Sequence, residues 1–128
     1  MSTKIKGSDA VRLNGESADR DLSGLAAVWA KITVSGGTPS LASSTNVSSL
    51  TDDGTGIVQT NTTAAFSSTS SFSVLCDSEY TSLSGTGAFI HYERGGNRTT
   101  SSYEQQHTQN GSDADPTSYN NSAHGDLA

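Results

Sequence analysis

The chain has 128 residues, a formal net charge of −6, and only 31% hydrophobic and 6% aromatic residues. Its length fits a single domain with an attached segment and excludes a multidomain enzyme. The acidic charge excludes the attraction that draws proteins to nucleic acids and anionic membrane surfaces, so we expect neither partner and no membrane insertion.

Residues 1–24 are predicted to form an N-terminal arm for attachment and assembly, because they show almost no periodic apolar pattern. More than half of the seven Lys and Arg residues lie here, at Lys4, Lys6, Arg12 and Arg20. Since the remainder of the chain is acidic, opposite charge favours docking of the arm onto another acidic subunit. An arm that packs on its own domain is the alternative. The start lacks the apolar region of a secretory signal peptide, so we expect synthesis in a cytoplasm.

Period-two alternation of apolar and polar residues from Ala27 to Val34 predicts a strand, with Trp29 on its more polar side. Gly36, Gly37 and Pro39 end this strand, since they cannot continue a ladder of hydrogen bonds. Residues 41–50 are predicted to form a second strand or a pair of short ones. Further strands, each bounded by Ser, Asp, Gly or Asn clusters, are predicted over residues 57–64, 72–76, 88–93, 99–108 and 119–123.

A tight turn is predicted between the strands 41–50 and 57–64. Asp52 and Asp53 can accept hydrogen bonds from their own backbone, and Gly54 reaches positive φ at little cost, as a hairpin requires. A calcium loop is the alternative use of these acids, but the alternating oxygen ligands and the distal glutamate of an EF-hand are missing.

No stretch shows several turns of helical spacing, and about seven short strands separated by turns predict an all-β fold. We expect a small antiparallel β-sandwich or barrel over residues 25–128, preceded by the extended arm. Because so few residues are apolar, we expect the core to be small and neighbouring copies of the chain to supply missing contacts.

Three histidines, His91, His107 and His124, lie in or beside predicted strands. Their spacing matches neither the i, i+4 pattern of helical metal ligands nor the HxH pattern of strands, so we expect solvated or interface-lining histidines and no metal site. Cys76 is the single cysteine, and we interpret it as a small buried hydrophobe.

No motif supports catalysis. The chain has no Gly-x-Ser-x-Gly elbow, and the glycine-bearing stretch Ser82–Gly87 lacks the lysine of a phosphate-binding loop. Asp77 and Glu79 could act as paired carboxylates on a strand end, but exposed charges explain them equally well, as loop positions explain Asp113 and Asp115. We therefore predict a protein that is not an enzyme and needs no cofactor.

Aromatic rings suggest a binding surface, because rings on a surface rich in hydroxyl and amide groups can hold carbohydrate by stacking and hydrogen bonding. The candidate residues are Trp29, Tyr80, Tyr92 and Tyr103. The alternative is that several of these rings, with Tyr119, form the small core. The loops at residues 77–87 and 110–116 are the expected contact regions, since loops on a rigid β scaffold commonly carry function.

Several motifs follow one another between Ala27 and Ala128. They are Ala27-Val28-Trp29, Asn46-Val47-Ser48-Ser49-Leu50-Thr51-Asp52-Asp53-Gly54-Thr55-Gly56, Thr62-Thr63-Ala64-Ala65-Phe66, Thr99-Thr100-Ser101-Ser102-Tyr103 and Gly125-Asp126-Leu127-Ala128. Their order resembles the β-domain at the ends of bacteriophage tail-fibre and other virion appendage proteins. The chain departs from that family at Gln59, Thr60 and Asn61, where the family carries aromatic or aliphatic residues.

The resemblance implies a structural virion protein, a tail-fibre or appendage subunit made in the host cytoplasm. It also implies a homotrimer that contacts other virion proteins and can bind a host surface glycan. A capsid fibre or decoration protein is one alternative, and a glycan-binding module is another.

Overall fold

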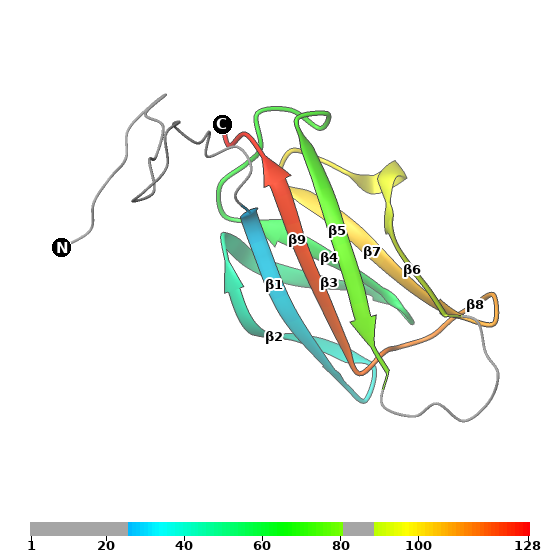
Figure 1. The fold of residues 1–128 in the computed structure, drawn as a ribbon. Coiled ribbons are helices and arrows are strands. Elements are labelled where there is room, and N and C mark those ends of the chain that lie inside the picture. The colour runs from blue at the N-terminus through cyan, green and yellow to red at the C-terminus, as the bar shows by residue number, and fades with distance from the viewer. Residues whose placement is uncertain (1–25, 81–88) are drawn as a thin grey trace, which may run out of the picture.

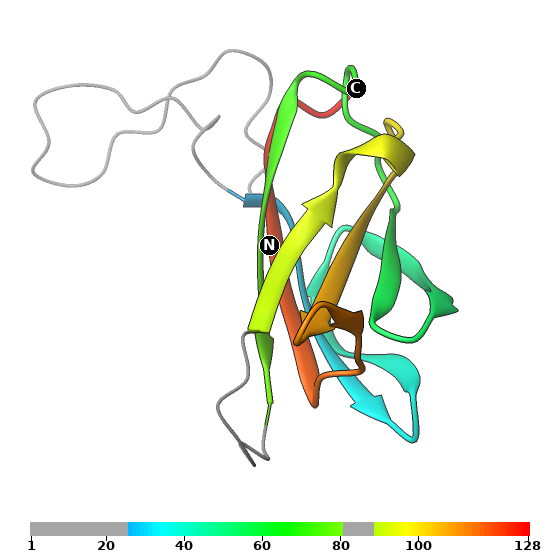
Figure 2. The ribbon, with the colours of Figure 1, turned by 90° about the vertical axis from the view of Figure 1, so that its right-hand side faces the viewer.

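The computed structural model describes residues 26–80 and 89–128. Over these ranges the chain forms two antiparallel sheets that face each other as the layers of a sandwich (Figures 1 and 2). The described residues contain no α-helix, only the single 3₁₀ turn η2 (Gly95–Asn97). The predicted all-β fold is confirmed, as a sandwich and not a closed barrel. The predicted arm and the stretch Ser82–Gly87 lie outside the described residues.

The first sheet has the strand order β2-β1-β9-β5. Its strands are β1 (Ala26–Ser35), β2 (Thr38–Thr45), β5 (Phe72–Glu79) and β9 (Ser118–Gly125). The second sheet has the order β3-β4-β7-β6, and a short strand β8 also pairs with β7. Its strands are β3 (Val47–Gly54), β4 (Ile57–Thr62), β6 (Phe89–Arg94), β7 (Ser102–Gln109) and β8 (Ser112–Asp113).

The chain crosses from the first sheet to the second at Asn46, so the stretch 41–50 belongs to two strands, β2 and β3, as the alternative of a strand pair expected. Asn46 has a φ of 58°, a left-handed conformation that asparagine tolerates better than most residues. Its side-chain oxygen accepts a hydrogen bond from Ala64 N at 2.7 Å, and its amide donates to Ala27 O at 3.3 Å. These bonds fix the corner that separates β2 from β3.

The predicted central turn lies slightly later than expected. Asp52 does accept a hydrogen bond from Gly54 N at 3.1 Å, but β3 continues through Gly54 and the turn is Thr55-Gly56. Gly56 has a φ of 74°, and a Cβ there would lie 2.5 Å from the backbone oxygen of His107. Only glycine fits this position, because the turn packs directly on β7.

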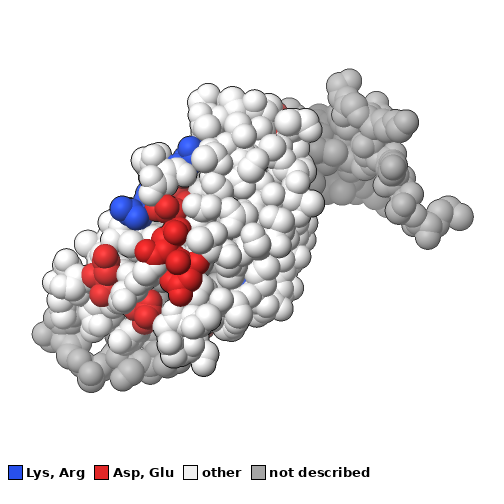
Figure 3. Space-filling view, turned by 180° about the vertical axis from the view of Figure 1, so that it is seen from behind, with Lys and Arg blue, Asp and Glu red and all other residues white. Residues whose placement is uncertain are grey.

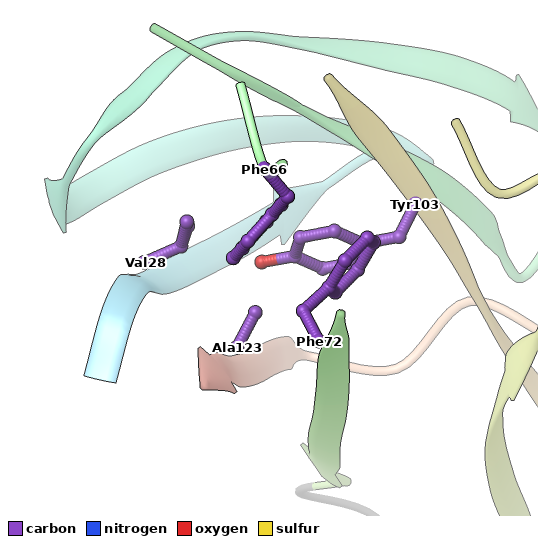
Figure 4. Close-up of a cluster of buried hydrophobic side chains, with 5 residues drawn as sticks. All are labelled: Val28, Phe66, Phe72, Tyr103 and Ala123. Carbon is purple, nitrogen blue, oxygen red and sulfur yellow. The ribbon is translucent and has the colours of Figure 1, made fainter. Parts of the chain in front are cut away.

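Two groups of buried apolar side chains fill much of the interior. The first, shown in Figure 4 and called here the aromatic cluster, consists of Val28, Phe66, Phe72, Tyr103 and Ala123. Its two phenylalanine rings stack with centroids 3.9 Å apart. The second consists of Ala30, Ile32, Val58 and Tyr119. Both groups include residues of both sheets, so they hold the layers together.

Polar side chains fill the rest of the interior. The buried hydroxyl of Tyr103 donates to Asn121 Oδ1 at 2.7 Å, and Asn121 Nδ2 donates to Thr60 Oγ1 at 3.2 Å. This chain of hydrogen bonds links β7, β9 and β4 across the sandwich. The shortage of apolar residues is thus offset within one chain, at least in part, by buried polar groups that satisfy one another.

Candidate functional site

A hollow of about 260 Å³ lies at one end of the sandwich. Three segments distant in sequence line it: the β1–β2 hairpin, the end of β5 and the segment before β9. The lining residues are Val34, Gly36, Gly37, Tyr80, Asp115, Pro116 and Thr117. We call this hollow the end pocket.

Backbone hydrogen bonds join the segments that line the end pocket. Thr117 O accepts from Val34 N at 2.9 Å, and Thr117 N donates to Glu79 O at 2.8 Å. The segment before β9 is therefore fixed both to β1 and to the end of β5. The pocket walls belong to the rigid part of the fold, which favours a preformed binding site.

The end pocket contains one aromatic ring and one carboxylate. The Tyr80 ring packs against the rings of Phe89 and His107, with centroid separations of 5.4 and 6.2 Å. These contacts fix the orientation of the Tyr80 ring. Asp115 Oδ1 accepts a hydrogen bond from Gly56 N at 2.6 Å, while Oδ2 lies toward Gly37. A ring face beside a positioned carboxylate can bind a small polar ring by stacking and hydrogen bonding.

The four predicted aromatic binding residues do not come together. Trp29 is 39% exposed on the first sheet, Tyr92 is 40% exposed on β6 of the second sheet, and Tyr80 lines the end pocket. Tyr103 has no exposed surface and belongs to the aromatic cluster, so it cannot be a surface binding residue. The small core needs this large ring, as the alternative interpretation anticipated.

Two of the histidines lie inside the sandwich, contrary to the expectation of solvated or interface-lining side chains. His107 is only 1% exposed, and its Nδ1 lies 2.8 Å from Ser78 Oγ. His91 is half-buried, and burial lowers its pKa from 6.5 to about 4. A serine beside an imidazole could suggest a nucleophile and base, but the burial of His107 keeps substrate away from this pair. His124 lies on the opposite face of its strand from the buried Ala123.

Acidic side chains gather on the face of the second sheet, seen in Figure 3. On this sheet Asp53 lies near Asp52 and near Glu104, which accepts hydrogen bonds from Arg94 at 3.0 Å and from Asn97 at 2.8 Å. Partial burial and the nearby Glu104 and Asp52 carboxylates raise the pKa of Asp53. The described residues contain no group of three or more His, Cys, Asp or Glu side chains arranged to hold a metal ion.

The other residues considered as candidates in the sequence, Asp77, Glu79 and Cys76, do not line the end pocket. Asp77 and Glu79 are both exposed on β5 and lie outside the end pocket, although they point the same way as expected. Cys76 is half-buried on the inward side of β5, and burial raises the pKa of its thiol to about 11. Asp115 belongs to the predicted contact loop 110–116, whereas Gly36 and Gly37 were predicted only to end a strand and were missed as pocket residues.

Comparison with known proteins adds no relative. No protein-family model, curated protein or solved structure matches the chain. The resemblance to virion appendage proteins therefore rests on the motifs alone. Within residues 26–80 and 89–128, no helix is both long enough and apolar enough to span a membrane.

Proposed function

We propose that this chain is a non-enzymatic structural subunit of a bacteriophage virion, in a tail fibre or appendage. The observation that carries the proposal is the order of motifs from Ala27 to Ala128, which resembles the end domains of such proteins. The sandwich is compatible with it, because Ala27-Val28-Trp29 falls in β1 and the Asp- and Gly-rich motif ends at a tight turn. Labelling of intact particles with an antibody would separate a tail location from the alternative of a capsid fibre or decoration protein.

Large apolar side chains on the surface support assembly with other copies. Trp29 and Leu75 are 39% and 65% exposed, and both pair in register with Ser122 of β9, so they lie in one row across the first sheet. Ile90 and Tyr92 are 54% and 40% exposed on β6. A neighbouring copy would remove these groups from water, and we propose a homotrimer on this basis. Light scattering at micromolar concentration tests the oligomer, and a stable folded monomer would contradict it.

The N-terminal arm is proposed to attach the subunit to another virion protein. Asp9, Glu16, Asp19 and Asp21 balance its basic residues, so positive charge is concentrated before Asp9, at Lys4 and Lys6. Salt should therefore weaken attachment through these lysines. Deleting residues 1–21 should leave a folded sandwich that does not join the particle. Incorporation of the truncated protein at normal copy number would show that the arm is not the anchor.

A second candidate function is glycan binding in the end pocket. The specific observation is the fixed Tyr80 ring beside the Asp115 carboxylate in a hollow of about 260 Å³, close to the size range of small-ligand sites. A glycan array that binds the protein should lose its signal for Tyr80→Ala and keep it for Tyr92→Ala, a tyrosine on a different face. Thermal unfolding must show that both variants fold. A folded wild-type protein that binds no glycan and adsorbs to no host cell leaves only the structural role.

A further inference from the structure

Two histidines face each other inside the sandwich, on the side where β5 and β6 are the edge strands of the two sheets. His91 of β6 pairs directly with His107 of β7, and the ring centroids lie 6.2 Å apart in an edge-on arrangement. His91 also contacts the ring of Tyr119 on β9, with centroids 5.5 Å apart, while His107 reaches Ser78 on β5. The histidine pair therefore connects the second sheet to the first.

The surroundings of this pair suit neutral imidazoles. Neither ring nitrogen of His91 has a hydrogen-bond partner, and Nε2 of His107 and both amide atoms of Gln105 also lack one. A neutral imidazole has one N–H to donate, whereas a protonated one has two. Protonation would add N–H donors to both rings. The Gln105 side chain and the Asp77 backbone favour the charged form of His91, but burial outweighs them, because a buried donor without a well-placed acceptor is costly.

Nearby charged groups oppose this effect without cancelling it. The titratable groups that act on the pair or contact its rings are Asp77 from β5, Tyr80 at the end of β5, Asp115 from the segment before β9, and Tyr119 from β9. Cys76 of β5 and Glu93 of β6 lie near each other on this side of the interior. Burial is the largest cause of the lowered pKa of His91, the neighbouring His107 adds to it, and Asp77 opposes both. Burial likewise lowers the pKa of His107 against the opposing charge of Asp115.

Two of the acidic side chains on this side are already engaged elsewhere. Glu93 forms an ion pair with Arg98, and Asp115 Oδ1 accepts the hydrogen bond from Gly56 N. Neither is free to turn toward an imidazolium without losing that contact. Asp77, the carboxylate that favours the charged form of His91, lies on the exposed face of β5 and does not offset the burial of the ring.

We propose that His91 and His107 form an acid-sensitive switch, whose protonation separates β6 from β5 and opens this side of the sandwich to water. The opposite side should stay closed, because Ala30, Ile32 and Val58 pack there and Asn46 fixes the passage from β2 to β3. Strands β5 and β6 are edge strands of different sheets, so their separation breaks no ladder of backbone hydrogen bonds between the described strands.

The direction of the effect follows from proton linkage. An exposed histidine binds its proton with a pKa of 6.5, but His91 in the closed sandwich does so only near pH 4. The closed state thus holds this proton more weakly than the open state, on the order of 100-fold. Its full stability is present above pH 6.5 and is lost progressively as the pH falls toward 4.

Hydrogen–deuterium exchange at pH 7.5 and pH 5.0, corrected for the intrinsic exchange rate, tests where the chain opens. We expect exchange in residues 72–79 and 89–94 to increase at least tenfold more than exchange in residues 26–45. An equal increase in all segments would overturn the local opening, since it would indicate global unfolding. No increase anywhere would overturn the switch.

Variants test whether the histidines cause the effect. His91→Asn and His107→Asn should each flatten the fall of the urea midpoint between pH 7.5 and 5.0, whereas His124→Asn should retain the wild-type slope. An unchanged slope in both interior variants contradicts the proposal. If a variant does not fold, ring-proton NMR of the wild-type protein can follow the titration of His91 and His107 instead. Titration of both histidines at pH 6.5 with no change in hydrogen exchange would also contradict the proposal.

Discussion

The two ends of the sandwich interior differ in how they exclude water. In the aromatic cluster, stacked rings fill the space, and the Tyr103 hydroxyl has a partner in Asn121. Around the histidine pair, His107 Nδ1 bonds to Ser78, but both ring nitrogens of His91, Nε2 of His107 and the Gln105 amide are buried without a well-formed hydrogen bond. Burial alone therefore does not stabilise the packing of the two sheets. Buried side chains contribute fully only where their polar atoms also have hydrogen-bond partners.

The largest effect is expected in the aromatic cluster. Phe66→Ala removes a ring that is 1% exposed and stacks on Phe72 at 3.9 Å, so it should reduce the free energy of unfolding by about 3–5 kcal/mol. Urea unfolding at pH 7.5 measures this change. Leu41→Ala is the matched control, because a side chain that is 37% exposed and lies outside the proposed contact row should change stability by less than about 0.5 kcal/mol. A similar loss in both variants would refute the importance of this cluster.

A smaller effect is expected where the aromatic cluster meets polar groups. Tyr103→Phe leaves Asn121 Oδ1 buried without its donor and should cost about 1–3 kcal/mol. Tyr92→Phe is the control, since the Tyr92 hydroxyl donates to Gln106 on the exposed face and solvent can replace it. Equal urea midpoints for these two variants would mean that the interior hydrogen bond contributes nothing.

Beside the histidine pair the expected effect is smaller again. Gln105→Met keeps the volume of a fully buried side chain but removes an amide that has no partner, so stability should change by less than about 1 kcal/mol. Thr60→Val supplies the contrast, because it removes the acceptor of the Asn121 amide and should cost more. A large loss in Gln105→Met would reveal hydrogen bonds, such as those of buried water, that this side of the interior depends on.

The smallest effect concerns reactivity rather than stability. Cys76 lies on the inward side of β5 between the two regions, and burial, with Glu93 and Asp77 nearby, raises its pKa from 9.0 to about 11. At pH 8 its thiolate fraction should be about 100-fold lower than in the unfolded chain, so iodoacetamide should react correspondingly slowly. Mass spectrometry of native and urea-unfolded protein measures both rates, and equal rates would contradict the burial of this thiol.

Local patterns predicted much of the fold. The alternation from Ala27 to Val34 coincides closely with β1, and Gly36-Gly37 forms the hairpin that follows it. Pro39 lies within β2, which tolerates proline because it is an edge strand. Strand β7 was harder to interpret, since its side chains are mostly polar and yet it is buried in the second sheet. Its burial depends on Glu104, Gln105 and His107 meeting other strands, which no local pattern records.

The candidate site could be predicted only in part. Loops near Tyr80 and Asp115 were expected to carry function, and both residues do line one pocket. The contribution of Gly36 and Gly37 depends on pairing between β1 and β9, which places distant segments side by side. The histidine pair likewise depends on the register of β6 and β7, because a shift by one residue would turn these rings outward.

The pairing of β1 with β9 also determines when the domain can fold. Ala26 is opposite His124, and β5 pairs with β9 alone in the first sheet. Strands β1 and β5 therefore cannot join one sheet until residues 118–125 have been synthesised. Such distant pairing slows folding, because a long loop must close before the contacts form. A chain that stops before Ser118 should leave β1 and β5 without a common partner, and its exposed strands would then be available to chaperones, proteases or other unfinished chains.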